Sequence, residues 1–274
     1  MVENKQVEVD VDKIIRTKAG KKAKFVPRFV VNWLKRIIHQ DEMNIFYREH
    51  QDEEGVEWLK SVLEYFDMKL VIKGQENLPA PGQGRYTFVS NHPLGGIDGV
   101  TIGAVLGEHY DGNIRYLLND LLMNLPGLRP LGVPINKTGA QGRETPRLVE
   151  EAFQSDHQII MFPAGLCSRK QKGVIRDLEW KKTFVQKSIQ YERNVVPIYF
   201  EGRNSNRFYN IANVCKTLGI KFNVAMAYLV DEMFRHQGDT FRVVIGQPIP
   251  WQTFDRSRTH TEWAQWLRQQ VYEL

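Results

Sequence analysis

Residues 88–99 read Phe-Val-Ser-Asn-His-Pro-Leu-Gly-Gly-Ile-Asp-Gly, an apolar run that leads into a polar loop with two adjacent glycines. The run predicts a buried strand that delivers His92 to its end, and the residues after the glycines predict the start of a helix. A strand, a loop and a helix in this order form the unit from which α/β folds are built. The stretch therefore predicts the fold class and a candidate catalytic residue together.

The spacing of His92 and Asp98 requires a loop between them. Six residues on a straight helix correspond to about 600° of rotation, so the two side chains would face different sides. Gly95 and Gly96 supply the backbone freedom that lets the chain fold back. A carboxylate beside a histidine fixes the tautomer of the ring and stabilises the imidazolium, as a general base requires. On spacing alone, a purely structural turn with a capping aspartate is the alternative.

The composition indicates one sizeable core without a disulfide framework. The chain has 274 residues, 42% of them hydrophobic, enough for one large core or for a domain with a helical appendage. Cys167 and Cys215 lie far apart and outside any metal-ligand spacing, which favours a reducing compartment and predicts no metal site. The N-terminus is polar, unlike a signal peptide, and the longest apolar run, residues 224–230, is shorter than the roughly 18 residues that span a bilayer. We therefore expect a cytoplasmic protein without a membrane-spanning helix.

The positive charge is concentrated near the N-terminus. Nine lysine and arginine residues and no acidic residue lie between Lys13 and Gln40, whereas the rest of the chain carries a net negative charge. Pro27 opens a predicted helix over residues 28–38 with a narrow polar sector and a wide apolar face. An apolar face with aromatic residues beside a basic run is typical of a helix at an anionic membrane surface. The residues expected to contact the membrane are Phe29, Trp33, Ile37, Lys21, Lys22 and Lys24.

Two other roles are open to this helix. Its apolar face could pack on the protein core, as the faces of most amphipathic helices do. A nucleic-acid-binding arm is disfavoured, because the segment has no reader motif and its apolar face is too wide for a solvated arm. We therefore expect no nucleic acid partner, and a membrane role predicts a peripheral position on the inner face of the cell membrane.

Strands and helices alternate along the rest of the chain. This alternation predicts an α/β fold with a mainly parallel sheet flanked by helices. The expected strands cover residues 69–73, 86–90, 115–118, 132–135, 158–162, 195–200 and 241–245, and the expected helices cover residues 54–67, 98–109, 145–154, 180–191 and 261–272. No repeat or long linker divides the chain. We expect a basic amphipathic helical segment over residues 1–67 and a catalytic domain over residues 68–274.

Three loops that follow expected strands carry unusual residues, and a fourth block puts a proline next to a strand; ligands of open α/β sheets gather beyond the carboxyl ends of the strands. The four blocks read Asn-His-Pro-Leu-Gly-Gly-Ile-Asp-Gly (91–99), Gly-Val-Pro-Ile-Asn-Lys (132–137), Phe-Pro-Ala-Gly-Leu-Cys-Ser-Arg-Lys (162–170) and Val-Pro-Ile (196–198). Together these blocks resemble the motifs of the glycerolipid (lysophospholipid) acyltransferase superfamily over about residues 70–200. The first and third blocks look most like those of the bacterial hemolysin-like acyltransferases. Some of these attach the second, ester-linked acyl chain of ornithine or glycine lipids.

The resemblance implies an enzyme that moves a fatty acyl group from an acyl thioester to a hydroxyl of a lyso-lipid. His92 Nε2 would take the hydroxyl proton, Asp98 would orient Nδ1–H, and backbone amides would stabilise the oxyanion. A covalent acyl-serine on Ser90 or Ser168 is disfavoured, because the chain has no Gly-x-Ser-x-Gly elbow. The expected donor is acyl-CoA or acyl carrier protein, with no other cofactor. The implied acceptor-binding residues are Asn136, Lys137, Gly165, Ser168 and Arg169.

Departures from the family pattern bear on the acceptor. The histidine and the aspartate are separated by five residues instead of four, Ala164 replaces the usual Glu, and Cys167 and Lys137 replace arginines. These basic positions are associated with the phosphate of a glycerol-phosphate acceptor, so their replacement weakens the case for a phosphate monoester. Arg169 could face a carboxylate instead, which a lyso-amino-acid lipid offers. The open alternatives are a 1-acylglycerol-3-phosphate acyltransferase, a lipid esterase and a non-catalytic membrane-binding relative.

Overall fold

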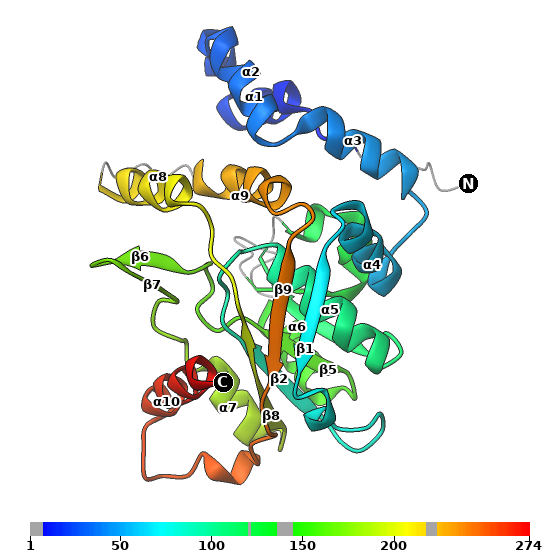
Figure 1. The fold of residues 1–274 in the computed structure, drawn as a ribbon, viewed down its shortest axis with the longest axis vertical. Helices are drawn as coiled ribbons and strands as arrows, with labels where there is room; N and C mark the ends of the chain where they lie inside the picture. The colour runs from blue at the N-terminus through cyan, green and yellow to red at the C-terminus, as the bar shows by residue number, and fades with distance from the viewer. Residues whose placement is uncertain (1–7, 120–121, 136–144, 218–223) are drawn as a thin grey trace. The chain divides into compact units, whose positions relative to one another are not determined.

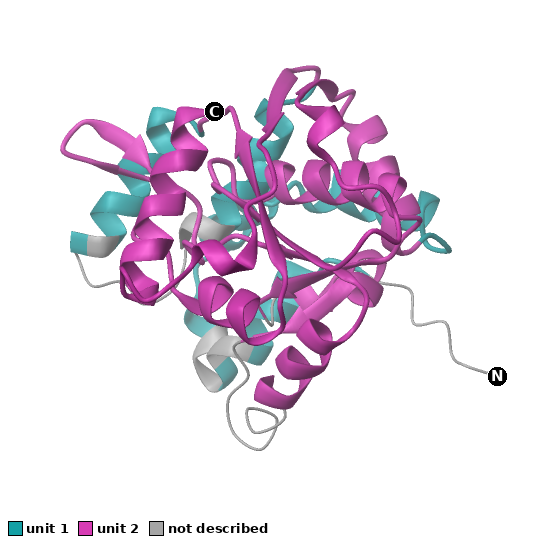
Figure 2. Ribbon diagram, turned by 90° about the horizontal axis from the view of Figure 1, so that it is seen from below, with its two compact units in different colours: residues 1–53, 204–237 teal, residues 54–203, 238–274 magenta. Residues whose placement is uncertain are grey.

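The computed structural model describes residues 8–119, 122–135, 145–217 and 224–274 of the chain (Figure 1). It forms two compact units, one of residues 1–53 with 204–237 and one of residues 54–203 with 238–274 (Figure 2). This division differs from the boundary expected after residue 67, because helix α4 (Gly55–Tyr65) belongs to the second unit. The reason lies in its packing. A Cβ placed on Gly127 would lie 2.1 Å from the Trp58 ring, and a Cβ placed on Gly103 would lie 2.9 Å from the Leu59 side chain. Both of these α4 residues therefore pack directly on the second unit.

The second unit is built on a sheet whose described strands follow the order β1-β9-β8-β2-β5-β3-β4. All neighbouring pairs are parallel except β8 and β9, so β1 and β9 run against the other five strands. The strands are β1 (Lys69–Lys73), β2 (Tyr86–Ser90), β3 (Ile114–Leu118), β4 (Gly132–Pro134), β5 (Gln158–Met161), β8 (Asn194–Phe200) and β9 (Thr240–Ile245). The mainly parallel α/β sheet expected from the sequence is confirmed.

Helices cover both faces of this sheet (Figure 1). Side chains alternate along a strand, and Val89 and Met161 share a core with helices α6 (Thr145–Gln154), α7 (Thr183–Gln190) and α10 (His260–Glu273). Phe88 points the other way, where its ring contacts Tyr110 at the end of α5 (Ile97–His109). Every residue of β5 is buried, as in a parallel strand covered on both faces.

Strands β8, β2 and β5 end at the same edge of the sheet. The register pairs Ser90 with Ile198 and Val89 with Met161, so the loop after β2, the loop after β5 and the end of β8 leave the sheet side by side. The blocks expected at residues 91–99 and 162–170 therefore lie at one edge. Most of the second block, from residue 136 onward, lies outside the described residues.

The first unit is helical. Its described elements are α1 (Val11–Ala19), the 3-10 helix η1 (Gly20–Phe25), α2 (Arg28–Ile37), α3 (Gln40–Glu49), α8 (Asn206–Thr217) and α9 (Val224–Arg235). The Trp33 ring of α2 lies edge-on to Tyr228 of α9, with centroids 5.8 Å apart. His39 Nε2 lies 3.2 Å from Asp231 Oδ1. Residues 204–237, for which the sequence pattern predicted no element, thus join the N-terminal helices across a long stretch of chain.

The outward face of α2 differs from the expectation at Ile37. This side chain is only 4% exposed, because α2 packs against α1, α3 and α9, so Ile37 does not contribute to an outer apolar face. Phe29 and Trp33, one turn apart, are 73% and 37% exposed, and Phe25 just before the helix is 75% exposed. Lys24 is exposed, whereas the side chains of Lys21 and Lys22 lie outside the described part of the structure. Among the described residues, no helix is both long and apolar enough to cross a membrane.

Candidate active site

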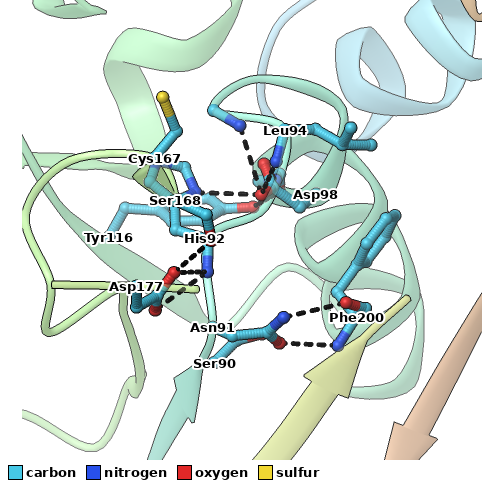
Figure 3. A network of polar contacts seen from close by, with 12 residues as sticks. Ser90, Asn91, His92, Leu94, Asp98, Tyr116, Cys167, Ser168, Asp177 and Phe200 are labelled. Carbon is cyan, nitrogen blue, oxygen red and sulfur yellow. Dashed lines mark hydrogen bonds and ion pairs between the residues drawn. The ribbon is translucent and has the colours of Figure 1, made fainter. Parts of the chain in front are cut away.

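Asn91 fixes the path of the chain as it leaves β2. Its side-chain amide donates to the carbonyl oxygen of Phe200 at 2.8 Å and accepts from the Phe200 N–H at 2.7 Å (Figure 3). This pair of bonds ties the end of β2 to the end of β8 in a buried position. The residue that follows, His92, is thereby held at a fixed place above the sheet edge.

The structure brings His92 and Asp98 together, as the loop between them requires. His92 Nδ1 lies 3.0 Å from Asp98 Oδ2, and the intervening Gly95 has a φ of 81°, a left-handed conformation that favours glycine. Asp98 lies in the first turn of α5, and its carboxylate also accepts the N–H groups of Leu94, Gly95 and Gly99 at 3.0, 3.2 and 2.9 Å. The carboxylate is fully buried and its position is set by four donors (Figure 3).

The charges of this pair reinforce each other. Burial opposes the ionised carboxylate, but the neighbouring His92 and the bonds from Leu94 and Gly95 outweigh it and hold the pKa of Asp98 below its ordinary value. Burial likewise opposes the charged imidazole, but Asp98 and a second carboxylate, Asp177, raise the pKa of His92. Because Asp98 is ionised and can only accept, Nδ1 carries the proton and Nε2 is the basic nitrogen.

Nε2 of His92 is the atom available to a substrate. No described residue forms a hydrogen bond with it, and the side chain is 18% exposed. The Phe162 ring, directly after β5, lies tilted against the imidazole, with centroids 4.3 Å apart and planes inclined by 31°. A carboxylate on one ring nitrogen and an open second nitrogen form the arrangement of a general base with its orienting group.

The loop after β5 and the segment after β7 (Val174–Arg176) hold the backbone of His92. Ser168 N–H donates to the His92 carbonyl oxygen at 2.7 Å, and the His92 N–H donates to both oxygens of Asp177 at 3.2 Å. Asp177 also accepts from Ser168 Oγ at 2.6 Å and from Trp180 Nε1 at 2.9 Å. Sequence reasoning missed Asp177. The available signal was a lone aspartate three residues before a tryptophan, whose indole N–H needs an acceptor when it is buried.

Ser168 does not take the place expected for an acceptor-binding residue. Its side chain is buried and its hydroxyl donates to Asp177, so it has no face open to a ligand. Ser90 is buried as well, and its hydroxyl donates to Asn91 Oδ1 at 3.4 Å. Neither hydroxyl is bonded to His92. This geometry opposes a covalent serine intermediate, which requires the nucleophile to lie within hydrogen-bond reach of its base.

Arg169 and Gly165 lie in the same loop region. Arg169 begins β6 (Arg169–Gln171), which forms a hairpin with β7 (Val174–Arg176), and its Nη1 donates to the carbonyl oxygen and to Sγ of Cys167. Burial and the positive charge of Arg169 lower the pKa of His92, but Asp98 and Asp177 outweigh them. Gly165, with a φ of 69°, closes a turn through a bond from its N–H to the Phe162 carbonyl oxygen. Asn136 and Lys137 lie outside the described residues.

Comparison with known proteins identifies relatives over nearly the whole chain. A family model described as an acyltransferase matches residues 13–274. A lyso-glycine lipid O-acyltransferase of Bacteroides thetaiotaomicron is 63% identical over 266 residues, which is 97% of each chain. A lyso-glycine lipid O-acyltransferase of Phocaeicola vulgatus is 60% identical over 266 residues, covering 97% of this chain and 95% of that protein.

The fold also resembles a solved structure. The crystal structure of the 1-acyl-sn-glycerophosphate (LPA) acyltransferase PlsC from Thermotoga maritima matches with a TM-score of 0.51, covering 96% of this chain and 94% of that one. Because the two sequences are only 15% identical, this likeness concerns the fold alone. It agrees with a parallel sheet whose strand ends carry the His92 loop.

Proposed function

Because this chain belongs to the acyltransferase family, we propose that it transfers a fatty acyl group from an acyl thioester to the hydroxyl group of a lyso-glycine lipid. The acceptor is supported by two relatives with this named activity, 63% and 60% identical over almost the full length. The observation that carries the chemistry is the His92–Asp98 pair, whose Nε2 is open to a substrate at the edge of the sheet.

In the proposed reaction, His92 Nε2 takes the proton of the acceptor hydroxyl as its oxygen attacks the thioester carbonyl carbon. Asp98 stays ionised, holds Nδ1–H and stabilises the imidazolium. The tetrahedral intermediate then collapses with cleavage of the carbon–sulfur bond, and the imidazolium returns its proton to the leaving thiolate. The products are the ester and the free thiol of the carrier, and His92 ends in its starting form.

Arg169 is the proposed contact for the acceptor's carboxylate. An N-acylated glycine headgroup ends in a carboxylate, which an arginine can bind through two parallel hydrogen bonds. The proposal is supported by the place of Arg169 in the loop region that follows β5, two residues from Cys167 and next to Ser168, whose N–H binds the His92 carbonyl oxygen. Asn136 and Lys137 are further candidates from the sequence pattern, and Gly165 offers backbone close to the same loop. The donor is acyl-CoA or acyl carrier protein, both of which are anionic.

The first unit is the proposed membrane contact. Phe25, Phe29 and Trp33 are exposed apolar side chains beside the exposed cations Lys24 and Arg28, a combination that suits an anionic lipid surface. We accordingly propose a peripheral position on the inner face of the cell membrane. There the enzyme meets an acceptor whose acyl chain is already in the bilayer.

The experiment is an assay of purified protein with a labelled acyl thioester, supplied as acyl-CoA or as acyl carrier protein, and a panel of lyso-lipids. We expect a diacylated product with lyso-glycine lipid and a much lower rate with lysophosphatidic acid. Release of free fatty acid instead of a new lipid would show an esterase. A strong preference for lysophosphatidic acid would show that the acceptor proposal is wrong while acyl transfer stands.

A further inference from the structure

We propose that Asp177 is a positioning residue of this acyltransferase, which holds His92 through its backbone and completes the anionic surroundings of the imidazole. The inference rests on the proposed role of His92 as the general base. It concerns a residue 85 positions away in sequence that reaches the site only through the fold.

The geometry is a closed ring of three hydrogen bonds that joins the loop after β2, the loop after β5 and the segment after β7 (Figure 3). The His92 N–H donates to the Asp177 carboxylate at 3.2 Å, Ser168 Oγ donates to the same carboxylate at 2.6 Å, and the Ser168 N–H donates to the His92 carbonyl oxygen at 2.7 Å. The N–H of His92 is therefore held by the segment after β7, and its carbonyl oxygen by the loop after β5. A shift of Asp177 would release the backbone that carries the base.

The ring is anchored on its far side. Asp177 Oδ2 accepts from the indole N–H of Trp180, which is buried in the core shared by α7 and α10. The backbone N–H of Asp177 donates to the hydroxyl of Tyr272, and Arg268 donates to its carbonyl oxygen. The position of the carboxylate is thus set by α10 as well as by its own segment.

Asp177 is a buried carboxylate whose direct hydrogen-bond partners are neutral groups. The residue is only 3% exposed, and none of the ion pairs among the described residues joins a lysine or arginine to its carboxylate. These partners are the His92 backbone N–H, Ser168 Oγ and Trp180 Nε1. A buried carboxylate without a cation is destabilising relative to a well-packed apolar group. The carboxylate binds the backbone of His92, the residue that forms an imidazolium in the proposed reaction.

The charged groups that face His92 come from three elements. Asp98 belongs to α5, Asp177 to the segment after β7, and Arg169 to β6, so two anions oppose one cation. The buried thiol of Cys167 and the phenol of Tyr116 complete the polar groups nearby, and burial raises the pKa of both. Loss of the Asp177 charge should therefore make the imidazolium less stable and lower the pKa of His92.

The test is Asp177→Asn in the full-length enzyme, with kcat, acceptor KM and the pH profile of kcat/KM measured together. The variant keeps the shape of the side chain, removes its charge and turns an amide N–H₂ toward one of the three donors. We expect kcat to fall by about 10- to 100-fold with little change in KM, because Asp177 does not touch the substrate. The acidic limb of the profile, which is the rise of kcat/KM with pH as His92 loses its proton, should move to lower pH by about half a unit.

A merely structural role would lower kcat without moving this limb. The control is Phe153→Leu, which replaces a buried ring in α6. The two variants are compared under conditions where the melting temperature of Phe153→Leu matches that of Asp177→Asn. Phe153→Leu should leave the limb in place. An Asp177→Asn enzyme with kcat within twofold of wild type, or with a reduced kcat and an unmoved limb, would overturn the proposal.

A second variant keeps the proposal testable if Asp177→Asn does not fold. Ser168→Ala removes one donor of the ring but leaves the carboxylate and its charge. We expect kcat to fall about 3- to 10-fold with the acidic limb unmoved, and a folded Ser168→Ala enzyme with wild-type kcat would contradict the ring. Because the profiles can be recorded with whichever lyso-lipid the wild type accepts, a wrong acceptor does not affect this test.

Discussion

Asp98→Asn should nearly abolish acyl transfer while the fold survives. In the structure, Oδ2 of Asp98 accepts from His92 Nδ1, Leu94 N–H and Gly95 N–H, and Oδ1 accepts from Gly99 N–H. An asparagine keeps most of these bonds when its oxygen takes the Oδ2 place. The amide nitrogen of the asparagine then takes the Oδ1 place and faces the Gly99 N–H. Two donors cannot bond to each other, so one donor is left unsatisfied, which costs about 1–3 kcal/mol of stability.

The larger effect is on the transition state. At the 3.0 Å separation of His92 Nδ1 and Asp98 Oδ2, a full imidazolium and a carboxylate attract by about 5 kcal/mol at an effective dielectric constant of about 20. The charge on His92 is only partly developed in the transition state, so a loss of about 3–4 kcal/mol, or two to three orders of magnitude in kcat, is expected.

The assay measures release of the carrier thiol and formation of the ester in parallel, with thermal melting as the check on folding. The matched control is Asp111→Asn, because Asp111 is exposed and has a φ of 50°, which asparagine adopts equally well. The control should retain wild-type kcat. A folded Asp98→Asn enzyme with kcat within fivefold of wild type would refute the reasoning.

Three further predictions concern the pH profile, the membrane face and the acceptor. The base must be neutral to act, and the pKa of His92 is raised. We therefore expect kcat/KM to rise with pH through an inflection above the ordinary histidine value of about 6.5. An inflection below that value would contradict the raised pKa of the base. Replacement of Phe29 and Trp33 by Ser should release the protein from anionic vesicles, whereas the control Val214→Ser, at another exposed apolar residue, should not. Equal release by the double variant and by the control would argue against the Phe29–Trp33 face as the membrane contact. Arg169→Lys should raise the acceptor KM several-fold at nearly constant kcat, because the charge stays but the bidentate contact is lost, and an unchanged KM measured with lyso-glycine lipid would exclude the contact.

The sheet and the approach of His92 to Asp98 could be predicted because local signals define them. Strands such as β2 and β5 are short apolar runs bounded by polar turns, and their expected limits agree with the structure to within one residue. The two glycines of the 91–99 loop also made the return of the chain toward Asp98 predictable. The catalytic roles of these two residues stay predictions.

The remaining features depend on contacts between distant parts of the chain. Helices α8 and α9 join the N-terminal helices through contacts such as Trp33 with Tyr228, which no local periodicity reports. The same packing accounts for the burial of Ile37, because the wide apolar face of α2 did not indicate which side meets a neighbour. Asp177 was missed because its partners lie on three separate segments and its own segment has no regular pattern.

The most direct test of the central claim is the rate of acyl transfer by His92→Ala. The substitution removes the proposed base, while Asp98 keeps the N–H groups of Leu94, Gly95 and Gly99, so the loop should stay folded and the melting temperature should change little. We predict that kcat with the preferred lyso-lipid falls by about three orders of magnitude or more at every pH. A folded His92→Ala protein that still forms the diacylated lipid at near wild-type rate would contradict the account.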